Sequence, residues 1–285
     1  LYGIVYEDYN IRLVSYFSVS LFLLLSGVTA FYSLEKNKDN NMILYVLKRE
    51  VKIFVPYAVA VFVVMILSGY DITKYFSELF KFSVSGPFYF IAFFIQLICV
   101  SPLLYIAFNK INKIRYNKIF TAVFLIILGI IGYRFCIDCV IFDIYGGGGV
   151  LLGGTYLPLF ALGMFFAYRG FERVNKYRIS LFFIFLAAAV FMAICIINNS
   201  MFLDIILPTG LNVNPPGLTL CLFAFVVFIC IYCGCSLWEQ SKNIALKAFI
   251  KLFDWLGGST LYIFLYHSLI IILLTNFVSL RYGLI

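Results

Sequence analysis

The feature that most constrains this chain is a series of long apolar stretches joined by short polar segments. A hydrocarbon core about 30 Å thick takes roughly 20 apolar residues of helix to cross. Eight stretches come near this length: residues 13–34, 53–69, 87–108, 119–133, 150–168, 179–197, 218–238 and 256–277. The sequence therefore predicts an all-α, polytopic bundle of about eight transmembrane helices.

Composition agrees with a chain whose main solvent is lipid. Hydrophobic residues make up 64% of the 285 residues and charged residues only 12%, whereas about a quarter of an average soluble domain is charged. No internal repeat and no long polar linker divides the sequence. We therefore expect residues 1–285 to form a single transmembrane domain.

The Lys and Arg residues are concentrated in every second connecting segment. Counted from the N-terminal end, the nine segments carry 1, 5, 2, 4, 1, 4, 0, 3 and 1 of them. Cytoplasmic loops retain Lys and Arg, so residues 36–48, 110–118, 169–178 and 242–251 are predicted to be cytoplasmic. Both ends of this chain should lie outside the cytoplasm of a cell-membrane protein. The net charge of +8 thus indicates topology, and no nucleic-acid partner is expected.

A polar stripe near the C-terminus is one candidate site, because polar groups within apolar spans cost free energy. It contains the only histidine, His267, and Ser259, Tyr262 and Tyr266 share parts of a helix face with it. Two interpretations stay open: a functional site, or a histidine that only packs by hydrogen bonding to a neighbouring helix. We expect a neutral imidazole in either case, since a membrane interior disfavours the charged form. A lone histidine without paired Cys/His spacings predicts no metal site.

A basic cluster at the predicted cytoplasmic end of the second span is the other candidate. Arg49 and Lys52 are three residues apart and would face one way on a helix, as an anion clamp at the bilayer surface. Topology alone also explains such a cluster. The functional interpretation is a site for a phosphate-bearing cytoplasmic ligand.

Four stretches, in order, resemble motifs of the acyltransferase 3 family of membrane enzymes. Residues 18–27 resemble its FF-x-LSG helix, and Arg49-x-x-Lys52 with Pro56 resembles its RxxR element and following proline. Residues 156–164 resemble its apolar FxxGM segment, and Ser259, Tyr262 and His267 its late S-x-x-Y-x-x-x-x-H span. Each motif alone is weak, but four in sequence with a suitable topology are more specific.

The resemblance implies a membrane-bound O-acyltransferase, an enzyme that transfers groups other than amino-acyl groups. The donor would be acyl-CoA, with acetyl-CoA expected, bound from the cytoplasm with Arg49 and Lys52 near its phosphates. The acceptor would be a hydroxyl of an extracytoplasmic glycan or a related cell-envelope molecule. Apart from the donor and this acceptor, the expected partner is membrane lipid.

Two departures from the family pattern affect the site residues. Family members usually begin with a helix that carries an arginine and a catalytic histidine, so a chain that starts at Leu1 is interpreted as a fragment. His267, Tyr262 and Tyr266 are then expected to have supporting catalytic roles, with the main base on the absent helix. Lys52 stands where the family has its second arginine, which keeps the charge but loses the planar fork that holds phosphate in two-point contact.

Two other functions remain open at this point. An aromatic-rich bundle with few charges would also suit a transporter or flippase of lipid-linked sugars, although such proteins often show inverted repeats, which this sequence lacks. A sensory or assembly module that keeps the family fold without activity is the third hypothesis.

Overall fold

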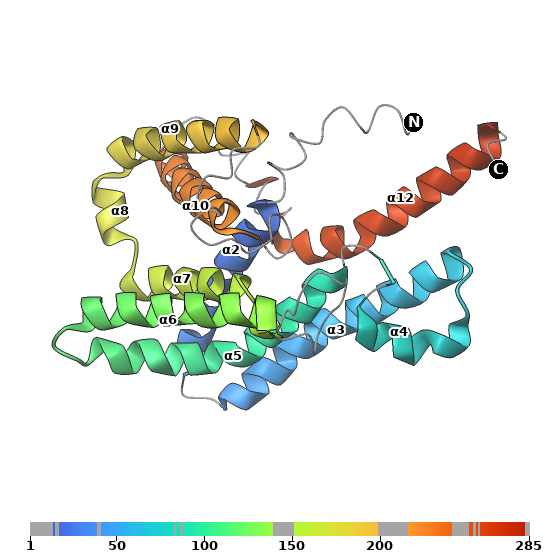
Figure 1. Ribbon diagram of the computed structural model, residues 1–285, viewed down its shortest axis with the longest axis horizontal. Helices are drawn as coiled ribbons and strands as arrows, with labels where there is room; N and C mark the ends of the chain where they lie inside the picture. Colours follow the sequence, from blue (N-terminus) through green and yellow to red (C-terminus); the bar gives the residue numbers. More distant parts are fainter. Residues whose placement is uncertain are drawn as a thin grey trace.

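The protein is all helical in the residues that its computed structural model describes: 14, 17–38, 41–82, 84–85, 88–138, 151–198, 216–240, 251–252, 255 and 257–282. No β-strand occurs within these ranges. The longer helices are α2 (Phe17–Lys36), α3 (Met42–Leu67), α5 (Tyr89–Asn112), α6 (Asn117–Asp138), α7 (Tyr156–Arg169), α9 (Arg178–Ile197), α10 (Leu218–Glu239) and α12 (Thr260–Tyr282). Short helices η1 (Ile72–Lys74), α4 (Tyr75–Lys81), η4 (Leu151–Gly153) and α8 (Glu172–Lys176) lie between them (Figure 1).

The predicted polytopic helix bundle is confirmed, but within the residues that the structure describes the number of candidate spans is about six rather than eight. Helices α2, α3, α5, α6, α9 and α10 are long and apolar enough to cross a membrane. The fifth predicted span corresponds to α7, which has only 14 residues. The eighth corresponds to α12, where the side chains at 268, 271–272 and 275–282 lie outside the described residues.

Helix α7 is short because the backbone before it and after it leaves the helical conformation. Leu152 and Gly153 have φ angles of 52° and 82°, values that glycine adopts readily and other residues rarely. Gly170 ends the helix with a φ of 69°. At 1.5 Å per residue, α7 is about 21 Å long, less than the hydrocarbon thickness. Counting apolar residues in 150–168 therefore overestimated the length of this helix.

Helix α3 begins 11 residues before the second predicted span, at Met42 rather than at residue 53. The Asn41 side chain caps its start by accepting a hydrogen bond from the backbone N–H of Ile43 at 2.9 Å, as N-cap asparagines commonly do. The basic cluster therefore lies in the second and third turns of α3. The cluster directly precedes the predicted span of residues 53–69, but it lies inside α3 because the helix begins before that span.

The core of the bundle lies around α2, which packs on α5, α7 and α10. Helix α7 buries most of one face, including Phe160 and Met164, and α5 buries a row of aromatic side chains near its start. Helix α9 buries only Met192 and Ile196. Its remaining apolar surface is suited to lipid, since bilayer tails are as apolar as the side chains.

Helices α2 and α7 cross with their backbones in close contact at two glycines. A Cβ atom added to Gly27 would lie 2.0 Å from the Phe160 carbonyl oxygen, and one added to Gly163 would lie 1.9 Å from the Leu24 carbonyl oxygen. Small residues permit such approaches between membrane helices. The two glycines belong to the first and third motif stretches of the sequence.

The α5–α6 turn and the α7–α8 junction, two of the basic connecting segments, lie toward the same side of the bundle (Figure 1). Contacts between segments occur there, from Tyr232 of α10 to Asn175 of α8 at 3.0 Å and from Arg178 to Gln240. Thr155 and Pro216 meet near the opposite ends of α7 and α10. The arrangement agrees with the alternation of basic and non-basic loops.

Candidate functional site

A cationic pocket opens between the end of α2 and the start of α3. Its volume is about 580 Å³, within the usual range for small-molecule sites of about 300–1,000 Å³. The described residues that line it are Ser33, Asn37, Asn41, Leu44, Tyr45, Lys48, Arg49 and Lys52. None of these lining residues is acidic, so the pocket favours an anion.

The helical repeat of α3 brings the three cations to this pocket. Lys48 and Lys52 are four residues apart, and Arg49 is three residues before Lys52, so their side chains project from neighbouring positions on one face. The Asn41 cap fixes where the helix begins and hence this register. The structure thus brings Arg49 and Lys52 together in one pocket.

Arg49 is the most fixed of the three cations. Its Nη1 donates to the Tyr45 hydroxyl at 2.6 Å, and its Nη2 donates to Thr29 Oγ1 of α2 at 3.4 Å. Lys48 and Lys52 are exposed and form no hydrogen bond or ion pair within the part of the chain that the structure describes. One anchored guanidinium and two mobile ammonium groups therefore face the same space.

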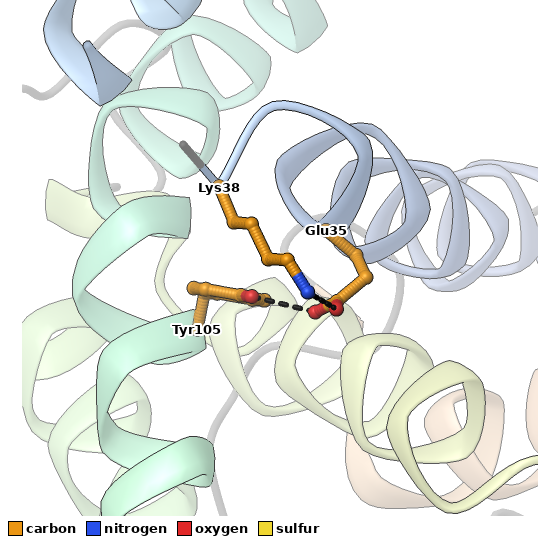
Figure 2. A network of polar contacts seen from close by, with 3 residues as sticks. All are labelled: Glu35, Lys38 and Tyr105. Atoms are coloured by element: carbon orange, nitrogen blue, oxygen red, sulfur yellow. Dashed lines mark hydrogen bonds and ion pairs between the residues drawn. The ribbon is translucent and has the colours of Figure 1, made fainter. Parts of the chain in front are cut away.

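Two carboxylates that the structure describes near the pocket, Glu35 and Glu50, are engaged away from it. Glu35 lies between α2 and α5, where it accepts a hydrogen bond from the Tyr105 hydroxyl at 2.6 Å and pairs with Lys38 at 3.2 Å (Figure 2). Glu50 points toward α5 and accepts from the Cys99 thiol at 3.8 Å. Because neither carboxylate lines the pocket, the positive charges on its wall stay available for a ligand.

The polar stripe near the C-terminus lies on α12, away from the pocket. Tyr262 is 50% exposed, whereas Tyr266 and His267 are half-buried. Nδ1 of His267 lies 2.5 Å from the Phe264 carbonyl oxygen. A carbonyl oxygen only accepts, so this contact places the proton on Nδ1 and leaves Nε2 of a neutral ring as an acceptor. The hydrogen bond described for the ring stays within α12 and does not reach a neighbouring helix.

The two candidate sites lie at different levels of α5. The Phe264 ring, one turn before His267, contacts the Phe90 ring at the start of α5, with centroids 4.8 Å apart. Glu50, next to Arg49, contacts Cys99, nine residues further along α5. Nine residues of helix span about 14 Å, so the structure does not bring His267 and Arg49 together.

Sequence reasoning missed the neutral polar groups of the pocket. Tyr45 precedes Arg49 by one helical turn, so the spacing of four residues could have identified it. Thr29 could not have been found in this way, because it reaches Arg49 from another helix. Within the described residues, no group of three or more His, Cys, Asp or Glu side chains could hold a metal ion.

Comparison with protein families decides what kind of molecule carries this pocket. The sequence model of the acyltransferase 3 family, described as an acyltransferase domain, matches residues 2–284. The chain belongs to the acyltransferase 3 family. Its helices carry the membrane acyltransferase domain of that family over nearly the whole length. Neither the curated proteins nor the solved structures give a match.

The four motif stretches of this acyltransferase fall on four helices. The first is on α2, the basic pair on α3, the third on α7, and the histidine stretch runs into α12. The first three meet, because Gly27 of α2 packs on α7 and Thr29 of α2 contacts Arg49 of α3. The α2–α7 crossing and the cationic pocket are therefore two parts of one packed unit.

Proposed function

We propose that this family member is an O-acyltransferase that moves an acyl group, with acetyl expected, from cytoplasmic acyl-CoA to a hydroxyl of an extracytoplasmic glycan or related cell-envelope acceptor. The observation that carries the proposal is the cationic pocket of Arg49, Lys48 and Lys52 in a chain that matches the family over residues 2–284. A guanidinium can bind a phosphate group by two parallel hydrogen bonds.

The donor fits the pocket in charge and in position. Three cations suit the phosphates of coenzyme A, and the neutral side chains of Ser33, Asn37 and Asn41 on the same wall offer hydrogen bonds to uncharged parts of the molecule. The segment of residues 36–48, which contains the connection from α2 to α3, is predicted to be cytoplasmic from its charge. The pocket would therefore receive a donor from the cytoplasm.

Because the pocket and His267 lie apart, we propose different tasks for the two sites. The Arg49 site would hold the phosphates, and the long pantetheine arm would carry the thioester along the bundle toward α12. In the transfer itself the acceptor oxygen attacks the thioester carbonyl, the new C–O ester bond forms, and the C–S bond breaks. The acceptor proton passes to a base, and the thiolate of coenzyme A leaves and takes up a proton.

His267, Tyr262 and Tyr266 would support this step at the acceptor side. The lone pair on Nε2 of His267 can accept a hydrogen bond from the acceptor hydroxyl and orient it. The two tyrosine hydroxyls can donate to the carbonyl oxygen as it becomes negative, the kind of stabilisation that contributes much to acyl transfer. We keep these as supporting roles.

The release of coenzyme A tests the proposal. Purified full-length protein in lipid, given acetyl-CoA and envelope glycans from its host, should release free thiol at a rate that depends on both substrates. Arg49→Ala should slow the release, and Lys113→Ala, which removes an exposed charge outside the pocket, should not. Sugar translocation without thiol release would favour a flippase, and neither activity in the intact protein would favour an inactive family-fold module.

A further inference from the structure

The Arg49 guanidinium is anchored from two helices, unlike the two lysines beside it. Tyr45 lies one turn earlier on α3 and accepts from Nη1 at 2.6 Å, while Thr29 on α2 accepts from Nη2 at 3.4 Å. The Thr29 hydroxyl in turn donates to the Ser26 carbonyl at 3.0 Å, which fixes the direction of its lone pairs. The guanidinium therefore bridges α2 and α3.

The α2 end of this bridge lies close in sequence to the crossing of α2 and α7. Thr29 follows Gly27 by two residues, and Gly27 holds α2 against the α7 backbone. Thr29 also lies seven residues before Lys36, the end of α2, which corresponds to about 10 Å of helix. Arg49 and its α2 partner thus lie further from the end of α2 than Ser33 and Asn37, which line the pocket together with Arg49.

The Arg49 guanidinium keeps hydrogen-bond donors for a ligand in addition to these two contacts. A guanidinium carries five N–H donors, of which Tyr45 and Thr29 use two. A long side chain that is already ordered loses less conformational freedom when a ligand binds, and this lowers the cost of binding. We infer that Tyr45 and Thr29 are positioning residues that hold the Arg49 fork in a phosphate-binding orientation. This inference rests on the proposed function of the pocket.

The test removes each hydroxyl while keeping the shape of the side chain. Tyr45→Phe should weaken binding of acetyl-CoA about three- to tenfold, the cost of ordering one long side chain. Thr29→Val should weaken it less, because a 3.4 Å contact is long for an N–H···O hydrogen bond, and Thr29→Ser should restore wild-type affinity. Tyr116→Phe, at an exposed tyrosine outside the pocket, is the matched control and should bind as the wild type does.

A double-mutant cycle separates positioning from direct contact with the ligand, because Tyr45 also lines the pocket. Dissociation constants measured by titration calorimetry should show that Tyr45→Phe has no further effect in an Arg49→Ala background, and kinetics of the single variant should show a larger rise in KM for acetyl-CoA than loss in kcat. An equal loss in both backgrounds would overturn the positioning role. Wild-type affinity in Tyr45→Phe would do the same while leaving the donor pocket intact. Failure of the wild-type protein to bind acetyl-CoA would overturn the proposed function itself.

Discussion

Gly27 and Gly163 hold α2 and α7 at a distance that no other residue pair allows, since a Cβ on either would lie within about 2 Å of a carbonyl oxygen of the opposite helix. Real Cβ atoms do not approach oxygen so closely, so the helices would have to separate. Because Thr29 lies just beyond the crossing and contacts Arg49, a separation would also change the cationic pocket.

The first prediction is that Gly27→Ala and Gly163→Ala each destabilise the protein by about 1–3 kcal/mol, the usual cost of overpacking a close-packed interior. Thermal unfolding of the purified protein in detergent measures the effect. Gly129→Ala on α6 is the control, because a Cβ there meets nothing within 4 Å, and alanine is favoured over glycine in a helix. Equal unfolding temperatures in all three variants would contradict the close contact between the α2 and α7 backbones.

The second prediction concerns the two cations that the sequence had singled out. Arg49→Ala should weaken acyl-CoA binding about ten- to a hundredfold, which corresponds to the loss of one charged hydrogen bond of roughly 1.5–3 kcal/mol. Lys52→Ala should have a smaller effect, because its exposed ammonium acts as a mobile point charge. Binding titrations with matched expression and folding measure both. If Arg49→Ala binds acyl-CoA as tightly as the wild type does, the basic cluster only sets the membrane topology and does not bind the donor.

The third prediction is the orientation of the bundle. Single cysteines placed at Lys113 and Lys176 of a Cys-free variant should resist a membrane-impermeant thiol reagent in intact cells, because the distribution of Lys and Arg predicts that the basic loops are cytoplasmic. A cysteine at Thr73, in the exposed segment after α3, should react. If the cysteines at both basic positions are labelled and Thr73→Cys is protected, the orientation of the bundle is opposite to the predicted one.

The fourth prediction tests His267. His267→Ala should lower acyl transfer because it removes the Nε2 acceptor, and His267→Gln should also lower it because the amide oxygen accepts from a different position and has a much lower proton affinity than the imidazole. Stability should change little, since the Phe264 carbonyl that the ring contacts lies within a helix, where carbonyls accept backbone hydrogen bonds. Ile263→Ala, on an exposed position of the same helix, serves as control. Wild-type turnover in both His267 variants would show that the residue only packs.

The lengths and spacing of the apolar stretches predicted the fold class correctly, but they could not predict which helices contact one another. Apolar length predicted α10 almost to the residue, with 218–238 expected and Leu218–Glu239 found. It failed for α7, because hydropathy does not register a backbone that turns at Leu152 and Gly153. It also placed the start of α3 too late, because a helix can continue through charged residues when a cap and a partner helix support it.

Only part of the candidate site could be predicted from the sequence, because the rest depends on contacts between helices. The three-residue spacing of Arg49 and Lys52 predicted that both lie on one face of a helix, and both line the pocket. The Arg49 contact with Thr29 joins residues 20 positions apart, and such a pairing depends on how α2 and α3 pack. Only the packed structure could reveal it.

The most direct test of the account follows the acyl group itself. Sealed inside-out membrane vesicles that contain the full-length protein and host glycans would receive acetyl-CoA labelled in the acetyl group on the outer, cytoplasmic face. The account predicts alkali-labile labelled ester on glycan inside the vesicles, with the yield reduced at limiting donor in Arg49→Ala and retained in Lys113→Ala. Wild-type vesicles that bind and consume no acetyl-CoA, and leave the glycan unlabelled, would contradict it.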